Sequence, residues 1–144
     1  MADLSEPRLP PLVLVRGEPP AGFPVEPNTV AELDDRRALW LGPDEWLVLD
    51  GVEADYREAA AAVDVSAERV AFRLSGPGAL EVLAQGCSLD LERFAPGSCA
   101  QTLLARAPIT LLRDDNGWTI LVRRSYSNYA RAWLDDALSA EPLV

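Results

Sequence analysis

The chain has 144 residues, of which 49% are hydrophobic and 25% are charged, and its formal net charge is −10. This length and composition predict one globular domain with a sizeable core and exclude a disordered chain. The negative charge repels phosphate groups and anionic lipid, so we expect neither nucleic acid nor a membrane surface as a partner.

The N-terminal segment, residues 1–29, holds seven of the twelve prolines of the chain. Proline fixes φ and removes a backbone donor, which excludes a long helix here. One short strand is expected at Leu12–Arg16. We interpret residues 1–29 as an extended proline-rich arm, either a flexible leader or a segment lying along a partner subunit. Residues 30–144 are expected to form a single α+β domain.

The next segment predicts a hairpin. The stretches "RRALWL" and "EWLVLD" are typical of strands, and "GPDE" between them supplies a turn, with Pro43 at its second position. Asp44 and Glu45 then lie at a solvated corner, where carboxylates are poor acid–base catalysts. Trp40 and Trp46 flank the turn, and they either pair across the strands or mark a contact surface.

Residues 52–63 are alanine-rich with interspersed charges, which predicts a helix. Residues 69–75 alternate in polarity and predict a half-buried strand. The following "SGPG" predicts a tight turn into a second helix, which Ser75 caps and Gly86 ends. A phosphate loop is the weaker interpretation of these glycines, because the third glycine of the dinucleotide fingerprint and a following lysine are missing.

The C-terminal part predicts three strands near residues 101–105, 109–113 and 118–124, with Asn116-Gly117 at the hairpin turn between the last two. Residues 125–138 predict an amphipathic helix. Its apolar face carries Tyr126, Tyr129, Ala130, Trp133, Leu134, Ala137 and Leu138. The order of elements indicates an α+β fold with helices packed on a largely antiparallel sheet.

The side chains that most often carry catalysis are missing. All thirteen basic residues are arginine, and the chain has neither lysine nor histidine. A Ser-His-Asp triad, a Schiff-base amine and a phosphate-loop lysine are therefore excluded. We expect no catalytic, cofactor-binding or metal-binding residue and no active site in this chain alone.

Two cysteines, Cys87 and Cys99, do not make a zinc site without a nearby histidine. A disulfide is possible, but two reduced, part-buried thiols are favoured in a cytoplasmic chain. The cytoplasm is the expected location, because the sequence shows no secretory signal and no apolar run of about 20 residues.

Candidate residues for a subunit interface lie around the hairpin turn and before the last helix; they are Trp40, Asp44, Glu45, Trp46, Arg123 and Arg124. Aromatic residues and arginine are enriched at interfaces. The alternative is that the tryptophans fill the core and the charges are ordinary solvated groups.

Five stretches carry a family resemblance: "LWLGPDEWLVL", "VDVS", "LSGPGALEVLAQGCSLDL", "FAPGSCAQTLLA" and "RSYSNYARAWLDDAL". In this order, from Leu39 to Leu138, they resemble the gamma subunit of heterotetrameric sarcosine oxidase. The second stretch and the start of the third also resemble the glycine-cleavage T-protein and its folate-binding relatives. In those relatives a histidine commonly follows the serine, whereas Ala67 stands there in this chain.

The resemblance implies an accessory, structural subunit with a fold similar to part of the T-protein. Its complex oxidatively demethylates sarcosine to glycine and passes the one-carbon unit to tetrahydrofolate. FAD, FMN, NAD and tetrahydrofolate are then expected in partner subunits, and the partners are the alpha and beta (and delta) subunits.

Two alternatives stay open. One is a stand-alone folate-binding or one-carbon-transfer domain of the T-protein type, with Asp64 as a polar anchor or base. For Asp64 itself, a role in a cap or turn is favoured. The other alternative is a small binding module that shares the fold but has lost the complex.

Overall fold

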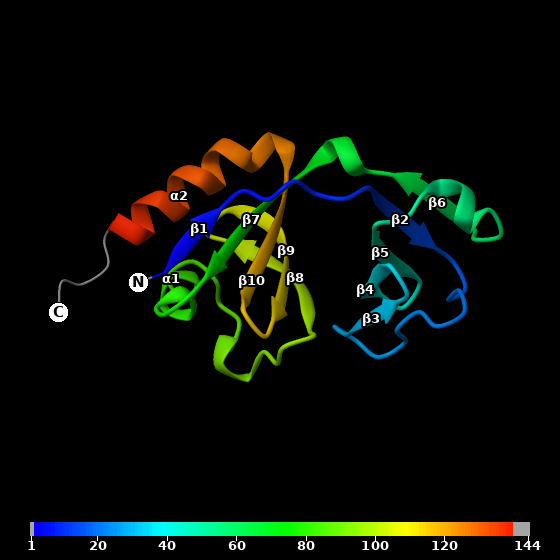
Figure 1. The fold of residues 1–144 in the computed structure, drawn as a ribbon, viewed down its shortest axis with the longest axis horizontal. Coiled ribbons are helices and arrows are strands. Elements are labelled where there is room, and N and C mark those ends of the chain that lie inside the picture. The colour runs from blue at the N-terminus through cyan, green and yellow to red at the C-terminus, as the bar shows by residue number, and fades with distance from the viewer. Residues whose placement is uncertain (1, 140–144) are drawn as a thin grey trace.

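The computed structural model describes residues 2–139 and contains two antiparallel five-stranded sheets that lie side by side (Figure 1). Sheet A has the order β1 (Asp3–Ser5), β7 (Arg69–Ser75), β10 (Gly117–Arg123), β9 (Ala107–Asp114) and β8 (Cys99–Leu104). Sheet B has the order β3 (Val30–Leu33), β4 (Arg36–Gly42), β5 (Glu45–Leu49), β2 (Leu12–Arg16) and β6 (Ala61–Asp64).

The helices are short except for the last. Helices α1 (Ala79–Ala84) and α2 (Ser127–Ser139) belong to the part of the molecule built around sheet A (Figure 1). Single turns of 3₁₀ helix form at η1 (Glu53–Tyr56), η2 (Ser66–Glu68), η3 (Leu91–Arg93) and η4 (Arg124–Tyr126). Helices packed on antiparallel sheets confirm the predicted α+β class.

Sheet A is covered on both faces because alternate residues of its strands enter different cores. On one face, Phe72 and Leu74 of β7 pack with Val82 of α1 and Leu134 of α2. On the other face lies a core shared by the two sheets, formed by Leu12, Leu39, Leu47, Leu49, Val65, Ala71, Cys99, Leu112 and Leu121. This shared core joins sheets A and B through apolar contact.

The far side of sheet B has a third core around Trp46. Val13 and Val15 of β2 and Val48 of β5 pack there with Phe23 and Tyr56. The ring of Phe23 meets those of Trp46 and Tyr56 edge-on, with centroids 5.8 and 5.7 Å apart. Sheet B is therefore also buried on both faces.

The proline-rich segment differs from the expected arm. Strand β2 forms where predicted, but it pairs with β5 on one side and β6 on the other. Strand β1 pairs with β7 at the edge of sheet A. Prolines flank these strands and none lies within them, so both strands keep the backbone donors that pairing requires. Residues 2–16 thus form part of both sheets.

The helix predicted over residues 52–63 is wrong. Only η1 is helical, and the chain then extends into β6, where Val63 pairs with Leu14 of β2. Alanine favours a helix weakly, and tertiary pairing overrides such a preference. Burial of Tyr56 against Phe23 holds the single turn in place.

The remaining predictions hold with shifts at element ends. Strand β7 has the predicted bounds, and α1 begins after Gly78, whose φ is 90°, so the glycine rather than Ser75 occupies the cap. Ala79, Val82 and Leu83 of α1 are buried in the core, and Leu80 is only partly buried. In α2, Ala130, Leu134 and Ala137 are buried as predicted, whereas Tyr129 and the preceding Tyr126 of η4 stay exposed.

The turn between β9 and β10 is organised by Asp114. Its carboxylate accepts two bonds from the Arg73 guanidinium, each 2.6 Å, and bonds from the amides of Asn116 and Gly117. The Arg73 hydrogen bonds are the main cause that lowers the pKa of Asp114. The ionised carboxylate of Asp114 therefore links β7 to the hairpin of β9 and β10.

We predict that Asp114→Asn lowers the free energy of unfolding by about 1 kcal/mol at neutral pH, because the turn acceptor remains while the ion pair is lost. A lowered pKa in the folded state stabilises the fold above the unfolded carboxyl pKa of about 4, and this stabilisation is lost as the pH falls through the folded value. Urea unfolding at several pH values should show the two proteins converging in acid. A gap that is the same at every pH would contradict the prediction.

Candidate functional site

The predicted interface residues around the hairpin turn divide into buried and exposed groups. Trp40 and Trp46 pair across β4 and β5, as one of the two interpretations predicts. Asp44 is exposed at the turn, and Glu45 pairs with Arg16 of β2 at 2.7 Å. Trp40 is partly buried.

Trp46 lies in the core, not at the surface. Its side chain is fully buried, and its indole Nε1 donates a 2.8 Å hydrogen bond to the carbonyl of Pro24. The alternation of β5 turns it toward Val48 and Phe23, into the third core. The Trp46 side chain therefore has no exposed surface in this structure.

The two other predicted residues, Arg123 and Arg124, lie on an arginine-lined cleft. Arg123 ends β10, and its cross-strand partner on β7 is Arg69. Directly paired residues of antiparallel strands point to the same face, and like charges in that arrangement repel. The structure thus brings two guanidinium groups together on a chain whose net charge is −10.

The surroundings of Arg69 do not neutralise this repulsion well. Its side chain is 18% exposed, and its nearest carboxylate is the mostly exposed Glu68, at 3.6 Å. Burial, followed by the charge of Arg123, lowers the pKa of Arg69, and Glu68 acts in the opposite direction. Arginine keeps its proton throughout the physiological range, so Arg69 stays a charged and poorly solvated group.

The cleft beside these residues has a volume of about 560 Å³. It is lined by Leu14, Val65, Ala67, Glu68, Arg69, Arg123, Arg124 and Ser125. Arg124 is held in place by a 2.8 Å hydrogen bond from its Nε to the carbonyl of Ala67. Leu14 comes from sheet B and Arg69 from sheet A, so both sheets build the cleft.

Three arginines beside one carboxylate suit this cleft for an anion, above all a carboxylate that a guanidinium can bind in bidentate fashion. Sequence reasoning found Arg123 and Arg124 but missed Arg69. In the sequence, the charge of Arg69 indicates only the solvent-facing side of a half-buried strand. The cross-strand register that places Arg69 beside Arg123 depends on a strand about fifty residues away.

The hairpin turn and the arginine cleft do not form one patch. Strand β2 has Arg16 beside Glu45 at one end, and at the other end the amide of Leu12 donates to Ser66 Oγ at 2.8 Å. A strand rises about 3.3 Å per residue, so these ends lie about 13 Å apart. The two predicted groups therefore lie at opposite ends of β2.

Asp64, the candidate base of the folate alternative, acts as a turn residue. Its carboxylate accepts the amide of Ser66 at 2.8 Å, and hydrogen bonds from Ser66 lower its pKa. A carboxylate that is exposed and held ionised is a weak proton acceptor. This contact supports the cap or turn role.

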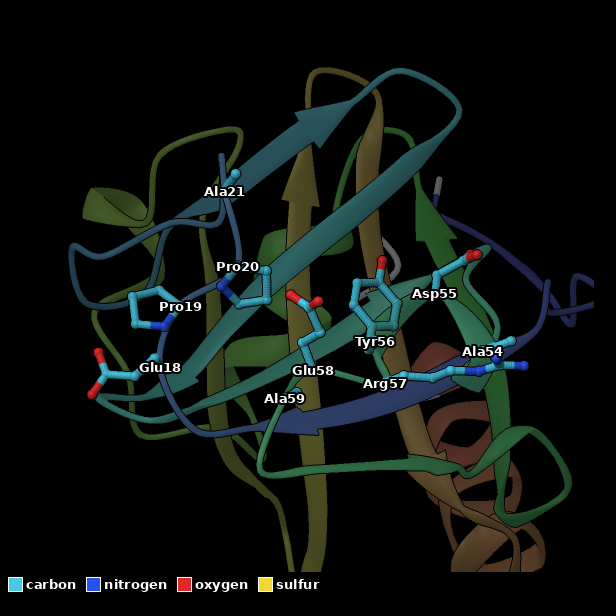
Figure 2. Close-up of a pocket in the computed structure, with 10 residues that line it drawn as sticks. All are labelled: Glu18, Pro19, Pro20, Ala21, Ala54, Asp55, Tyr56, Arg57, Glu58 and Ala59. Atoms are coloured by element: carbon cyan, nitrogen blue, oxygen red, sulfur yellow. The ribbon is translucent and has the colours of Figure 1, made fainter.

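A second hollow, of about 540 Å³, lies between residues 18–21 and the segment 54–59 (Figure 2). Figure 2 shows Tyr56 and Glu58 between Pro19 and Pro20 on one side and Asp55 and Arg57 on the other. The Tyr56 hydroxyl already accepts a 2.8 Å bond from Arg36. Glu18, Asp55 and Glu58 outnumber Arg57 on its walls, so this hollow does not suit an anion.

The glycines of "SGPG" line a smaller hollow with Glu81, Asp114 and Asp115. These carboxylates would repel a phosphate group. Gly76 and Gly78 both have positive φ, as a tight strand-to-helix turn requires. The structure agrees with the predicted tight turn.

Residues 2–139 contain neither a candidate metal site nor a helix that could span a membrane. No cluster of three or more His, Cys, Asp or Glu side chains that could hold a metal ion occurs there. No helix of this described part is long and apolar enough to cross a membrane.

The two cysteines are free and buried in different cores, on opposite faces of sheet A. Cys99 donates to the carbonyl of Trp40 at 3.4 Å. Burial is the main cause that raises the pKa of Cys99 to about 11.

We predict that Cys99 of the native chain resists alkylation, because at pH 8 the thiolate fraction is on the order of a thousandth and the sulfur is inaccessible. Mass spectrometry of peptides after iodoacetamide treatment, in buffer and in urea, measures the difference. Labelling of Cys99 at equal rates in both solutions would show that the shared core is open.

Two solved structures share the fold. A chain of the heterotetrameric sarcosine oxidase from Corynebacterium sp. U-96, in complex with pyrrole 2-carboxylate, superposes with a TM-score of 0.86 at 29% identity, over 99% of this chain and 88% of that chain. The glycine cleavage system aminomethyltransferase T from Bartonella henselae superposes with a TM-score of 0.66 at 16% identity, over 92% of this chain and 45% of that chain. The fold is therefore similar to part of the aminomethyltransferase T fold, as predicted.

The sequence matches the sarcosine oxidase, gamma subunit family over residues 22–141. Sarcosine oxidase subunit gamma of Corynebacterium sp. (strain P-1) is 36% identical over 139 residues, which cover 85% of this chain and 68% of that protein. The chain belongs to the sarcosine oxidase gamma subunit family. The family predicted from the sequence stretches is confirmed.

Proposed function

We propose that this chain is the accessory gamma subunit of a heterotetrameric sarcosine oxidase and contributes structure rather than chemistry. The observation that carries the proposal is the family match over residues 22–141, together with the superposition of 99% of the chain on a protein described as heterotetrameric. Its partners are the alpha, beta and delta subunits, and the complex works in the cytoplasm.

The complex oxidatively demethylates sarcosine to glycine and transfers the one-carbon unit to tetrahydrofolate. FAD, FMN, NAD and tetrahydrofolate bind to the partner subunits. The composition of this chain supports that division, because it offers no histidine or lysine to move protons or form an imine. The Asp64 carboxylate, already bound to Ser66, supplies no base in their place.

Co-expression with the alpha, beta and delta subunits tests the proposal. The gamma chain should co-elute with flavin absorbance in size-exclusion chromatography, whereas the chain expressed alone should be colourless and inactive. A folded chain that elutes apart from co-expressed, flavin-bearing partners contradicts the proposal.

A second function, a stand-alone folate-binding domain, is favoured by the position of the arginine cleft. Val65 belongs to the stretch "VDVS" that resembles the T-protein, Ala67 and Arg69 follow shortly after it, and the arginines could bind the carboxylates of a folate tail. Titration with a reduced folate, followed by tryptophan fluorescence, tests this function. Absence of a signal change at millimolar ligand would remove it.

A further inference from the structure

We propose that the pair Arg69–Arg123 is a docking site for an acidic side chain of a neighbouring subunit, an inference that rests on the proposed function. The register places the two residues directly opposite each other on β7 and β10. The fold gains nothing from this pair, because like charges at that position destabilise a sheet. A local arrangement that opposes folding is expected where function requires it.

The chemistry of the occupant follows from the groups around the pair. Glu68 is its nearest carboxylate and is mostly exposed, so the two guanidinium groups keep excess positive charge. Arg124 adds a third cation, oriented by its bond to Ala67. A carboxylate placed between Arg69 and Arg123 would remove their repulsion and bind the planar donors in a fork.

A polypeptide fits the site better than a free anion because the charged pair continues into an exposed apolar strip. In the ladder of sheet A, Val122 pairs with Ile109, so the next position on β9 beside Arg123 is Pro108, whose partner on β8 is Leu103. Leu103 is 51% exposed. A small hollow beside this strip is lined by Arg69, Gln101, Pro108, Ile109, Thr110, Leu121 and Arg123.

An acidic residue followed by apolar side chains can cover the charge and the strip together. Interfaces combine arginine anchors with apolar contact in this way. The overall charge of −10 adds a selective effect, because an acidic segment is repelled by most of the surface and attracted to this cleft.

The test uses the full chain in complex with its partner subunits, and it compares Arg123→Gln with Arg93→Gln. Arg93 lies exposed in η3, which packs on the opposite face of sheet A, so its replacement removes the same charge away from the cleft and the strip. We expect Arg123→Gln to weaken the apparent affinity for the partner subunits about tenfold or more and to flatten its dependence on salt. The control variant should change the affinity less than about twofold.

A second measurement separates docking from support of the fold. The urea midpoint of the isolated chain should stay equal or rise in Arg123→Gln, because a like-charge contact is removed. Weaker assembly without lower stability supports docking. Weaker assembly that follows a lower midpoint overturns it.

Three further outcomes have distinct meanings. Unchanged assembly by Arg123→Gln, while the wild-type chain still joins the complex, overturns the docking site and leaves the proposed function intact. Failure of the wild-type chain to join overturns both. Calorimetry of the isolated chain with succinate adds a third arm: binding that Arg123→Gln abolishes, with assembly unaffected, assigns the cleft to a free anion instead.

Discussion

Replacing Trp46 with alanine should lower the free energy of unfolding of the isolated chain by about 3–5 kcal/mol, the range for a large aromatic residue removed from a core. The side chain has no exposed surface and makes an edge-on contact with Phe23. Its removal also leaves the Pro24 carbonyl without the indole donor. The variant therefore creates a cavity and weakens the attachment to sheet B of the loop that carries Phe23 and Pro24.

Trp40→Ala is the matched control, because Trp40 faces Trp46 across the same hairpin but is only partly buried. Urea unfolding followed by circular dichroism should show a clearly smaller loss for the control. Equal losses would mean that the hairpin, and not the third core, determines the effect. Any weaker association of Trp46→Ala with partner subunits should disappear under conditions that keep it fully folded.

Removal of residues 2–16 should prevent folding of the isolated chain. The deletion takes β2 out of the middle of sheet B and leaves β5 and β6 without their common neighbour. It also removes Leu12 from the shared core and Val13 and Val15 from the third core, all fully buried. Each buried aliphatic side chain contributes about 1.5–3 kcal/mol, so the three together are comparable with the roughly 5–15 kcal/mol that stabilises a domain, and the lost strand pairing adds to this cost.

Removal of residues 2–6 alone is the control, because β1 is a short edge strand that pairs only with β7. This shorter deletion also loses the ion pair between Glu6 and Arg131, which is partly exposed. The control should fold with reduced stability. A cooperative, near-native urea transition of the longer deletion would show that residues 2–16 are dispensable for folding.

Local signals explain which elements were predictable. The hairpin of β4 and β5 follows from turn residues next to alternating strands, and β9 and β10 follow from Asn116-Gly117. Helix α2 has its buried residues at helical spacing. Each of these patterns is complete within about twenty residues, so no distant partner is needed to read it.

The errors have the opposite origin. Residues 61–64 extend because β2 is available for pairing, and β2 lies about fifty residues earlier in the chain. The sequence allows Trp46 to be a surface residue. In the structure it is covered by Phe23 and Pro24, which come from a loop with no regular structure. Arg69 is a candidate site residue only because the register with β10 places it beside Arg123. These features depend on pairing and covering by distant segments, which composition and periodicity do not encode.

The order of strands along the chain has a consequence for synthesis. All strands of sheet B lie within residues 12–64, and all strands of sheet A except β1 lie within residues 69–123. All strands of sheet B therefore leave the ribosome before β7 emerges. Leu39 and Leu47 then stay exposed to solvent until Leu112 and Leu121 are synthesised. The partly synthesised chain therefore presents an apolar surface that chaperones can bind.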